Sequence, residues 1–320
     1  MRWKFIDQFR GFAIFGMIIV NVCCEFNNSP YWLIHHQYGF TFADFVAPAF
    51  IFIVGFSYRL SFIKAKEHLP VSELRKKFIK RYLIITFLGF LYGHFDFHVA
   101  VWDALTDIGI AGLLLYPFIG KNKFYILFSG ITYLTVYQLL FSYTAYGKWL
   151  MEHSIDGGPL GPFSWSFILA CGAFCAVFFE NNRNKVSLQT FLCWLFGGLL
   201  LIGFGYFLSS PVLLPALPFT QKGMTASYSI FSSGLCIIAL CFFYIINEKV
   251  KITINALTTI GKNPLVIYFL QAILIFILQV SLLEKMQNGT LPIFITVFVI
   301  LSICYIVAKI LEIKSIFIKV

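Results

Sequence analysis

The sequence has few charged residues. Asp, Glu, Lys and Arg make up only 12% of its 320 residues, against roughly 25% in an average soluble domain. Hydrophobic residues make up 59%, and the mean hydropathy is +0.84, so the polar side chains cannot cover a soluble surface. This composition excludes a soluble globular enzyme, a disordered chain and a small secreted domain held by disulfides.

Several functional motifs are also missing. The sequence contains no Walker phosphate-binding motif, no Gly-x-Ser-x-Gly, no His-Glu-x-x-His and no Cys-x-x-Cys; an ATP-driven pump or a zinc protease would need such parts. We find no internal repeat, and no paired broken helices of the kind that many secondary transporters have. Most of the eight Cys residues lie inside apolar runs without His or acidic neighbours, so we expect no metal site.

Long apolar runs dominate the sequence. Their length of about 20 residues is that of a transmembrane helix, and they lack the alternation of a membrane β-barrel. We therefore expect an all-α, polytopic integral membrane protein in a lipid bilayer, with residues 1–320 as a single domain. Asn263 and Pro264 predict a helix break or start. Ten spans are predicted, at residues 8–27, 43–63, 79–95, 103–120, 124–145, 163–180, 187–208, 226–247, 264–283 and 291–312.

The net charge of +10 comes from short loops between the apolar runs. No basic domain exists, so we expect no nucleic-acid partner. If the N-terminus is inside, all but three of the 24 Lys and Arg residues lie on the inner side. The positive-inside rule then predicts an even number of spans with both termini cytoplasmic. Five of the six His residues lie near the outer face, which points to chemistry or binding there.

Two adjacent imidazoles and a carboxylate stand out near this outer face. His35 and His36 precede Asp44, which lies at the start of the second predicted span. An imidazole can act as a general base near neutral pH, and a carboxylate can orient it. The alternative interpretation is a pair of interfacial His residues, with Asp44 as an acid that stabilises the helix start.

Other polar residues lie at the ends of spans. Asn21 sits near the outer end of the first span, a depth at which such a group normally faces a cavity. Asp107 follows Asp103 by one turn and could bind a cation or sugar hydroxyls, or could be a simple helix-start acid. Asp156 begins a Gly- and Pro-rich loop that is either a plain turn or a backbone that approaches a ligand closely.

Two inner segments could bind an anion. Arg10 follows Asp7 by three residues, which is either a phosphate contact or a membrane anchor beside a helix-start acid. Lys262 and Asn263 follow Gly261 at the predicted helix start, where a phosphate could bind. The alternative is a turn at the membrane surface.

Five segments, in this order, resemble the transmembrane N-acetyltransferases typified by heparan-α-glucosaminide N-acetyltransferase, including its bacterial relatives. The first resembles the family's Asp-x-x-Arg-Gly to Val-Asn helix, and the second its second-helix signature. The others resemble the Asp-Pro-Glu-Gly-x-Leu-Gly loop, the lysine-bearing loop (here with Lys222) and the Gly-Met-Asn segment. The five segments are residues 5–21, 39–55, 156–162, 220–232 and 261–265.

The resemblance implies acetyl transfer across a membrane. The donor is cytosolic acetyl-CoA as co-substrate, and the acceptor is an amino sugar or glycan on the far side. The family's catalytic His lies in a His-x-x-Trp-x-Gly pattern. Here the closest match is His35-x-x-Tyr38-Gly39, one residue shorter, so His35 is our choice, with His36 as the substitute. The His would act as a general base or carry the acetyl group transiently, and Asp44 or Asn21 could fix its tautomer.

The remaining roles follow from the resemblance and from sidedness. Arg10, Lys262 and Asn263 are expected to contact the cofactor. Two positions depart from the family pattern. Where the family has Gln-Arg-x-Gly, this sequence has Thr-Asp-Ile-Gly, so Asp107 replaces a cation. Where the family has a His on the ninth helix, this sequence has Gln271. Residues expected to contact the acceptor are Asn21, Asp107, Asp156, Lys222 and Gln271.

The cellular setting and two alternatives complete the expectations. The membrane is expected to be the plasma membrane of a bacterium, the acceptor a cell-envelope or imported sugar, and a homodimer is possible in principle. A transporter or flippase for a sugar or lipid-linked sugar is the main alternative, and a non-catalytic scaffold is a further one. The choice between N- and O-acetylation is open.

Overall fold

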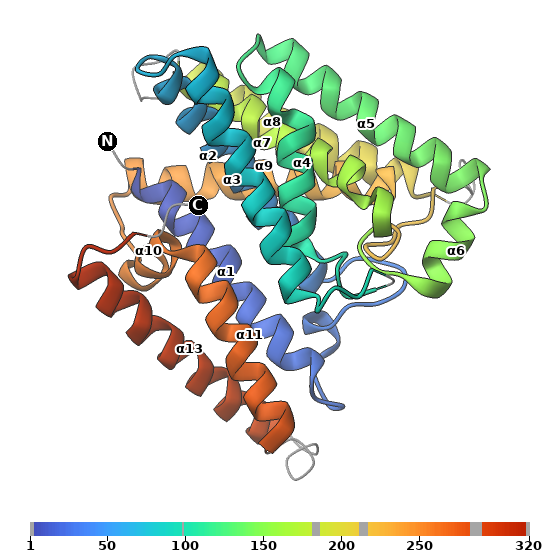
Figure 1. Ribbon diagram of the computed structural model, residues 1–320, viewed down its shortest axis with the longest axis vertical. Helices are drawn as coiled ribbons and strands as arrows, with labels where there is room; N and C mark the ends of the chain where they lie inside the picture. The colour runs from blue at the N-terminus through green and yellow to red at the C-terminus, as the bar shows by residue number, and fades with distance from the viewer. Residues whose placement is uncertain (1–2, 98, 181–185, 211–216, 282–289, 318–320) are drawn as a thin grey trace. The chain divides into compact units, whose positions relative to one another are not determined.

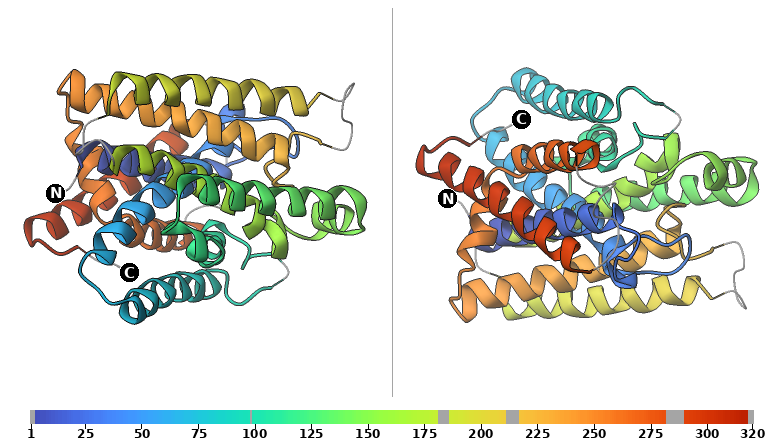
Figure 2. Two further views of the ribbon diagram at one scale, coloured as in Figure 1. Left: turned by 90° about the horizontal axis from the view of Figure 1, so that it is seen from above. Right: turned by 90° about the horizontal axis from the view of Figure 1, so that it is seen from below.

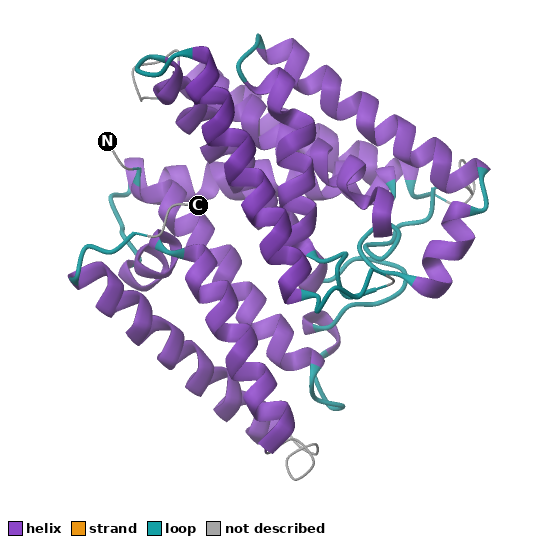
Figure 3. Cartoon of the chain, in the orientation of Figure 1, coloured by secondary structure: helices purple, strands orange, loops and turns teal. Residues whose placement is uncertain are grey.

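The computed structural model describes residues 3–97, 99–180, 186–210, 217–281 and 290–317. Helices are the only regular structure among these residues (Figures 1 and 3), which confirms the predicted all-α fold. In chain order they are α1 (Lys4–Cys24), η1 (Tyr31–Leu33), α2 (Phe42–Lys66), α3 (Val71–Tyr92), α4 (Ala104–Ile119), α5 (Lys123–Tyr143), α6 (Tyr146–His153), η2 (Gly158–Leu160), α7 (Gly161–Glu180), α8 (Leu188–Leu208), α9 (Ala226–Tyr244), η3 (Ile245–Lys249), α10 (Asn255–Lys262), α11 (Pro264–Ser281) and α13 (Thr290–Ile313).

Each of the ten predicted spans overlaps one helix of this series. Within the part of the chain that the structure describes, seven helices are long and apolar enough to cross a membrane, namely α1, α2, α5, α7, α8, α9 and α13. The pair α10 and α11 is an eighth candidate, bent by 92° between Lys262 and Pro264, which confirms the predicted helix break. Because α4 is shorter and α3 carries several charged side chains, the count of ten spans stays a prediction.

Large apolar side chains are exposed along several of these helices. Phe128 on α5, Leu200 on α8 and Phe298 on α13 have exposed fractions of 68%, 73% and 71%. Exposed apolar surface on this scale is unfavourable in water and normal against lipid tails. The protein is therefore an integral membrane protein with many helices.

Contacts within the chain group the described residues into two units. Because α2 and α9 each run without a break from one unit into the other, the prediction of a single domain over residues 1–320 stays a prediction. Unit 1 contains Met1–His36, Phe40–Phe50 and Phe242–Lys319, and unit 2 contains Gln37–Gly39 and Ile51–Cys241.

In unit 1, α1 packs against α10, α11 and α13 (Figure 1). Glycines allow the closest approach: a methyl group on Gly11 would collide with the Leu257 carbonyl, and one on Gly261 with the Asp7 carbonyl. Glu312, near the end of α13, accepts hydrogen bonds from α10. The start of α1 and the end of α13 thus lie at the same end of unit 1. Which side of the membrane this end faces stays a prediction.

In unit 2, glycines also bring backbones together. A methyl group on Gly55 of α2 would collide with the Leu169 carbonyl of α7. Gly198 of α8 and Gly234 of α9 face each other in the same way, and both views of Figure 2 show these two helices side by side. Small residues at such crossings are the usual means of packing helices in a membrane.

A buried ion pair joins three helices of unit 2. Arg59 Nε donates to Glu180 Oε1 at 2.8 Å and Nη2 donates to Oε2 at 3.2 Å. Its Nη1 donates to the carbonyls of Ile119 and Lys121. Because the guanidinium is paired in a two-point geometry and both Nη1 hydrogens have carbonyl acceptors, its charge is compensated. The pair holds the ends of α2, α4 and α7 together.

Candidate active site

His35 and Asp44 meet where α1 ends and α2 begins in unit 1. His35 Nδ1 lies 2.7 Å from Asp44 Oδ1. The other carboxylate oxygen accepts hydrogen bonds from Thr41 N at 2.8 Å and from Thr41 Oγ1 at 3.0 Å. The side chain of Asp44 is 1% exposed and that of His35 is 41% exposed. A fixed, buried carboxylate thus holds an imidazole that solvent can reach.

The start of α2 explains how Asp44 is positioned. Thr41 precedes the first helical residue, and Asp44 is three residues further along. An acid at this position reaches back to the backbone N–H of the residue before the helix, as in a capping box. Asp44 is therefore a helix-start acid that also contacts His35, and the role of this pair in catalysis stays a prediction. Thr41 was not singled out in the sequence, although its Thr-x-x-Asp spacing before an apolar run is the relevant signal.

His36 points to a different partner. Its ring stacks on Tyr31 with the ring centres 3.9 Å apart, and its Nε2 lies 3.0 Å from the Tyr31 carbonyl oxygen. Of the two adjacent imidazoles, the structure brings His35 to the carboxylate. This geometry favours His35 as the reacting residue.

Two amides meet inside unit 1. Asn21 Nδ2 on α1 donates to Gln271 Oε1 on α11 at 3.4 Å. Gln271 is 1% exposed, and its Nε2 has no hydrogen-bond partner among the described residues. A buried amide donor without a partner is unfavourable unless a water or a ligand accepts from it. Two of the five predicted acceptor-binding residues therefore form one polar group between apolar helices.

The three predicted cofactor-binding residues meet at the other end of unit 1. Arg10 Nη1 donates to the Gly261 carbonyl at 3.1 Å and pairs with Asp7 at 3.4 Å. Asn263 Nδ2 donates to the Ile316 carbonyl at 3.0 Å, and the Lys262 ammonium pairs with a carboxylate near the end of α13. Each of the three groups thus has a partner within the chain.

That carboxylate belongs to Glu312, which the sequence did not single out. It accepts hydrogen bonds from Lys262 Nζ, from Thr259 Oγ1 at 2.9 Å and from Lys309 Nζ at 3.0 Å. Two cations and a hydroxyl converging on one anion form a site that suits negative charge. No spacing pattern in the sequence connects residues so far apart.

The predicted residues of unit 2 form a separate group. Asp107 is completely buried in the first turn of α4, where the Trp165 side chain is its hydrogen-bond partner. Asp103 caps α4, because its Oδ1 accepts from the Ala104 N–H at 2.7 Å. Asp156 lies close to Asp107, because a methyl group on Gly161 would meet both the Asp156 carbonyl and the Asp107 carboxylate.

Lys222 and Asp156 join two loops of unit 2. Lys222 Nζ donates to the Met151 carbonyl at 2.8 Å, and the Gly157 N–H donates to the Lys222 carbonyl at 3.0 Å. Gln221 donates to the Asp156 carboxylate. Asp156, at a φ of 51°, and Gly157, at 86°, adopt left-handed backbone conformations, which suit a tight turn. Both predicted residues therefore shape the loops in which they lie.

Tyr146, the first residue of α6, contacts one of these loops and was not singled out in the sequence. Its hydroxyl donates to the Gly157 carbonyl and accepts from the Leu160 N–H at 3.0 Å. Burial raises the pKa of Tyr146 to about 12, so the hydroxyl keeps its proton at neutral pH and remains a donor.

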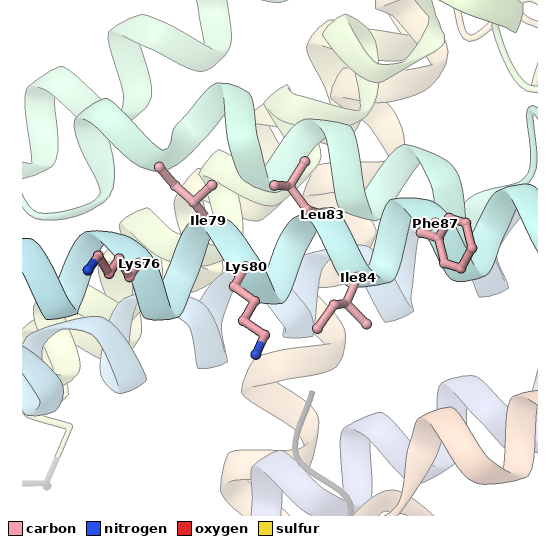
Figure 4. Close-up of a pocket in the computed structure, with 6 residues that line it drawn as sticks. All are labelled: Lys76, Ile79, Lys80, Leu83, Ile84 and Phe87. Atoms are coloured by element: carbon pink, nitrogen blue, oxygen red, sulfur yellow. The ribbon is translucent and has the colours of Figure 1, made fainter.

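A hollow of about 540 Å³ runs along one face of α3 (Figure 4). Its lining consists of apolar side chains together with Lys76 and Lys80. Lysines that extend from an apolar helix face are typical of the membrane boundary, where their ammonium groups reach water. The lining contains no acid, imidazole or nucleophile, so this hollow has the character of a lipid-facing surface.

The sequence comparison agrees with these observations. The model of the heparan-alpha-glucosaminide N-acetyltransferase catalytic family matches residues 2–273. The chain belongs to this family. The match includes every predicted site residue and ends within α11, so α13 with Glu312 lies beyond it. No curated protein matches the chain. Family and apolar helices together identify a membrane acetyltransferase.

Proposed function

We propose that the protein moves the acetyl group of cytosolic acetyl-CoA to an amino sugar on the extracytoplasmic side of a bacterial plasma membrane, with His35 as general base. The observation that carries this proposal is the His35–Asp44 pair, in which a buried carboxylate holds a reachable imidazole at 2.7 Å. Pairs of this kind orient the ring and stabilise its cation.

The donor and acceptor groups of the pair determine the tautomer of His35. An ionised carboxylate only accepts hydrogen bonds, so His35 Nδ1 carries the hydrogen that faces Asp44, and Nε2 is the basic nitrogen. Acetyl-CoA supplies the acetyl group as a thioester. His35 Nε2 takes a proton from the acceptor amine as the amine nitrogen attacks the thioester carbon. The new N–C bond replaces the C–S bond, and the imidazolium returns the proton to the departing sulfur.

In unit 1, the proposed base and the proposed donor-binding cluster lie near opposite ends of α1. Arg10 near the start of α1 and Cys24 at its end are 14 residues apart, or about 21 Å along the axis. His35 lies at the end of α1, and the basic cluster of Arg10 and Lys262 lies at its start. This cluster fits the phosphates of the donor, because Lys262 already holds an anionic group, the Glu312 carboxylate.

Asn21 and Gln271 lie between these ends. We assign them to the passage or the acceptor, because Gln271 keeps a buried N–H without a protein partner. Asp107 takes the same role in unit 2, because its carboxylate is completely buried among the helices of that unit. Asp156 and Lys222 act indirectly by holding their loops.

The test begins with donor binding in the purified, full-length protein. A ligand that binds only the folded state at a hundredfold excess over its Kd stabilises it by about 2.7 kcal/mol, so acetyl-CoA and CoA should raise the midpoint of thermal unfolding. Transfer is then measured in proteoliposomes with radiolabelled acetyl-CoA and glucosamine.

Two variants locate the base. His35→Ala should abolish transfer and keep the shift caused by acetyl-CoA, whereas the matched variant His36→Ala should keep transfer. Equal activity of His35→Ala and the unmodified protein would overturn the assignment of the base. No shift with acetyl-CoA, together with sugar uptake by the liposomes in its absence, would instead support a transporter.

A further inference from the structure

Unit 2 contains a groove with a volume of about 470 Å³. This volume lies within the ~300–1,000 Å³ of typical small-ligand sites. Its lining comes from four parts of unit 2: residues 37–38, the end of α5, the short helix α6, and Pro218. The lining includes Gln37, Tyr38, Lys148 and Glu152.

Hydrogen bonds hold the walls of this groove. The Gly39 N–H donates to the Phe219 carbonyl at 2.9 Å, which ties residues 37–39 to the loop around residue 219. Lys222 Nζ donates to the Met151 carbonyl at 2.8 Å, which ties the same loop to α6. Because the walls are fixed before a ligand arrives, binding needs little ordering of the protein.

The lining combines an exposed aromatic ring with hydrogen-bonding groups of both kinds. Tyr38 is 56% exposed and offers a flat apolar face with a polar tip. Glu152, whose side chain is 55% exposed, offers two acceptor oxygens, and Lys148, one helical turn away, offers donors. Gln37 offers both. A pyranose has a C–H face that can cover an aromatic ring and hydroxyls that both donate and accept.

We propose that this groove binds the glycan acceptor, with a pyranose ring against Tyr38 and sugar hydroxyls bonded to Glu152 and Gln37. The proposal rests on the proposed function. Its link to the chemistry is the chain itself, because Gln37 and Tyr38 follow His35 and His36 directly. The same loop thus supplies the base and part of the groove.

Kinetics of the full-length protein with a glucosamine disaccharide test this proposal. Tyr38→Ala should raise the KM for the disaccharide about tenfold, because it removes the aromatic face that the pyranose covers. The KM for acetyl-CoA should stay unchanged. Tyr143→Ala is the matched control, since Tyr143 is 78% exposed near the same end of α5 but does not line the groove. Glu152→Gln is a second variant, which should also raise only the KM for the disaccharide.

Direct binding separates this proposal from the proposed function. Calorimetry with the disaccharide and His35→Ala, which cannot transfer, should show binding that Tyr38→Ala weakens in the double variant. If the unmodified protein transfers acetyl groups but both groove variants keep their KM, the groove proposal is wrong and the proposed function stands. If the disaccharide binds at the groove but no transfer from acetyl-CoA occurs, the groove proposal stands and the proposed function is wrong. Absence of both binding and transfer overturns both.

Discussion

Replacement of Asp44 by Asn keeps the shape of the side chain and removes its charge. The carboxylate accepts three hydrogen bonds, from His35 Nδ1 at 2.7 Å, from Thr41 N at 2.8 Å and from Thr41 Oγ1 at 3.0 Å. Asn offers one acceptor oxygen and one NH₂ donor. The oxygen retains two bonds if it faces Thr41, and the NH₂ group then faces His35.

The substitution should change both the rate of transfer and the free energy of unfolding. Opposite an NH₂ group, His35 Nδ1 must accept, so the ring proton moves to Nε2 and that nitrogen can no longer act as a base. General acid–base catalysis contributes about 10²–10⁴ in rate, which corresponds to about 2.7–5.4 kcal/mol at 1.36 kcal/mol per tenfold change. The free energy of unfolding should fall by only about 1–3 kcal/mol, because hydrogen bonds to a charged group are replaced by weaker neutral ones.

The assay is acetyl transfer from acetyl-CoA to glucosamine in proteoliposomes, with thermal unfolding of the same samples. Asp44→Asn should lower kcat at least about a hundredfold and keep the shift caused by acetyl-CoA. The control, Thr41→Val, removes the Oγ1 donor and leaves the charge, so it should cost about 1 kcal/mol of stability and keep most of the turnover. If Asp44→Asn turns over like the unmodified protein, Asp44 is only a helix-start acid and the reasoning is refuted.

Three further predictions concern packing and the cofactor end. Gly55→Ala puts a methyl group against the Leu169 carbonyl and should lower the free energy of unfolding by about 1–3 kcal/mol in thermal unfolding. The control Gly203→Ala, whose methyl group would meet no atom within 4 Å, should be neutral or slightly stabilising. Equal unfolding midpoints for the two variants would contradict the close crossing of α2 and α7. Arg59→Met leaves the partly buried Glu180 carboxylate without its counter-charge and should cost about 3 kcal/mol, the lower end for buried pairs. A neutral result in detergent unfolding would show that water reaches the pair. Glu312→Gln removes the anion that pairs with Lys262, so acetyl-CoA should bind more tightly at low salt. An unchanged affinity in a titration would show that Lys262 does not belong to the cofactor site.

The long helices could be predicted from the sequence, and the short ones could not. Apolar runs of about 20 residues predict helices because backbone groups in lipid must bond within their own segment, and the restricted conformation around Pro264 predicts the break after α10. The helices α6 and α10 have eight residues each, too few to be stable alone. They exist because they pack against neighbouring segments, which local sequence does not reveal.

In the candidate site, too, the sequence predicts part of the arrangement and the tertiary structure decides the rest. Residue type, order along the chain and resemblance to a family singled out His35, His36 and Asp44, but they left the choice between the two imidazoles open. Only the folded chain separates them, because one ring meets Asp44 and the other stacks on Tyr31.

At the opposite end of unit 1, the sequence identified the basic residues but not their partner. Composition and hydropathy determine where the chain enters lipid, because each residue's transfer from water depends mainly on its own side chain. Partners depend on which helices become neighbours. Lys262 and Glu312 are 50 residues apart in the chain, and they pair only because α13 returns to the end of the unit where α1 begins.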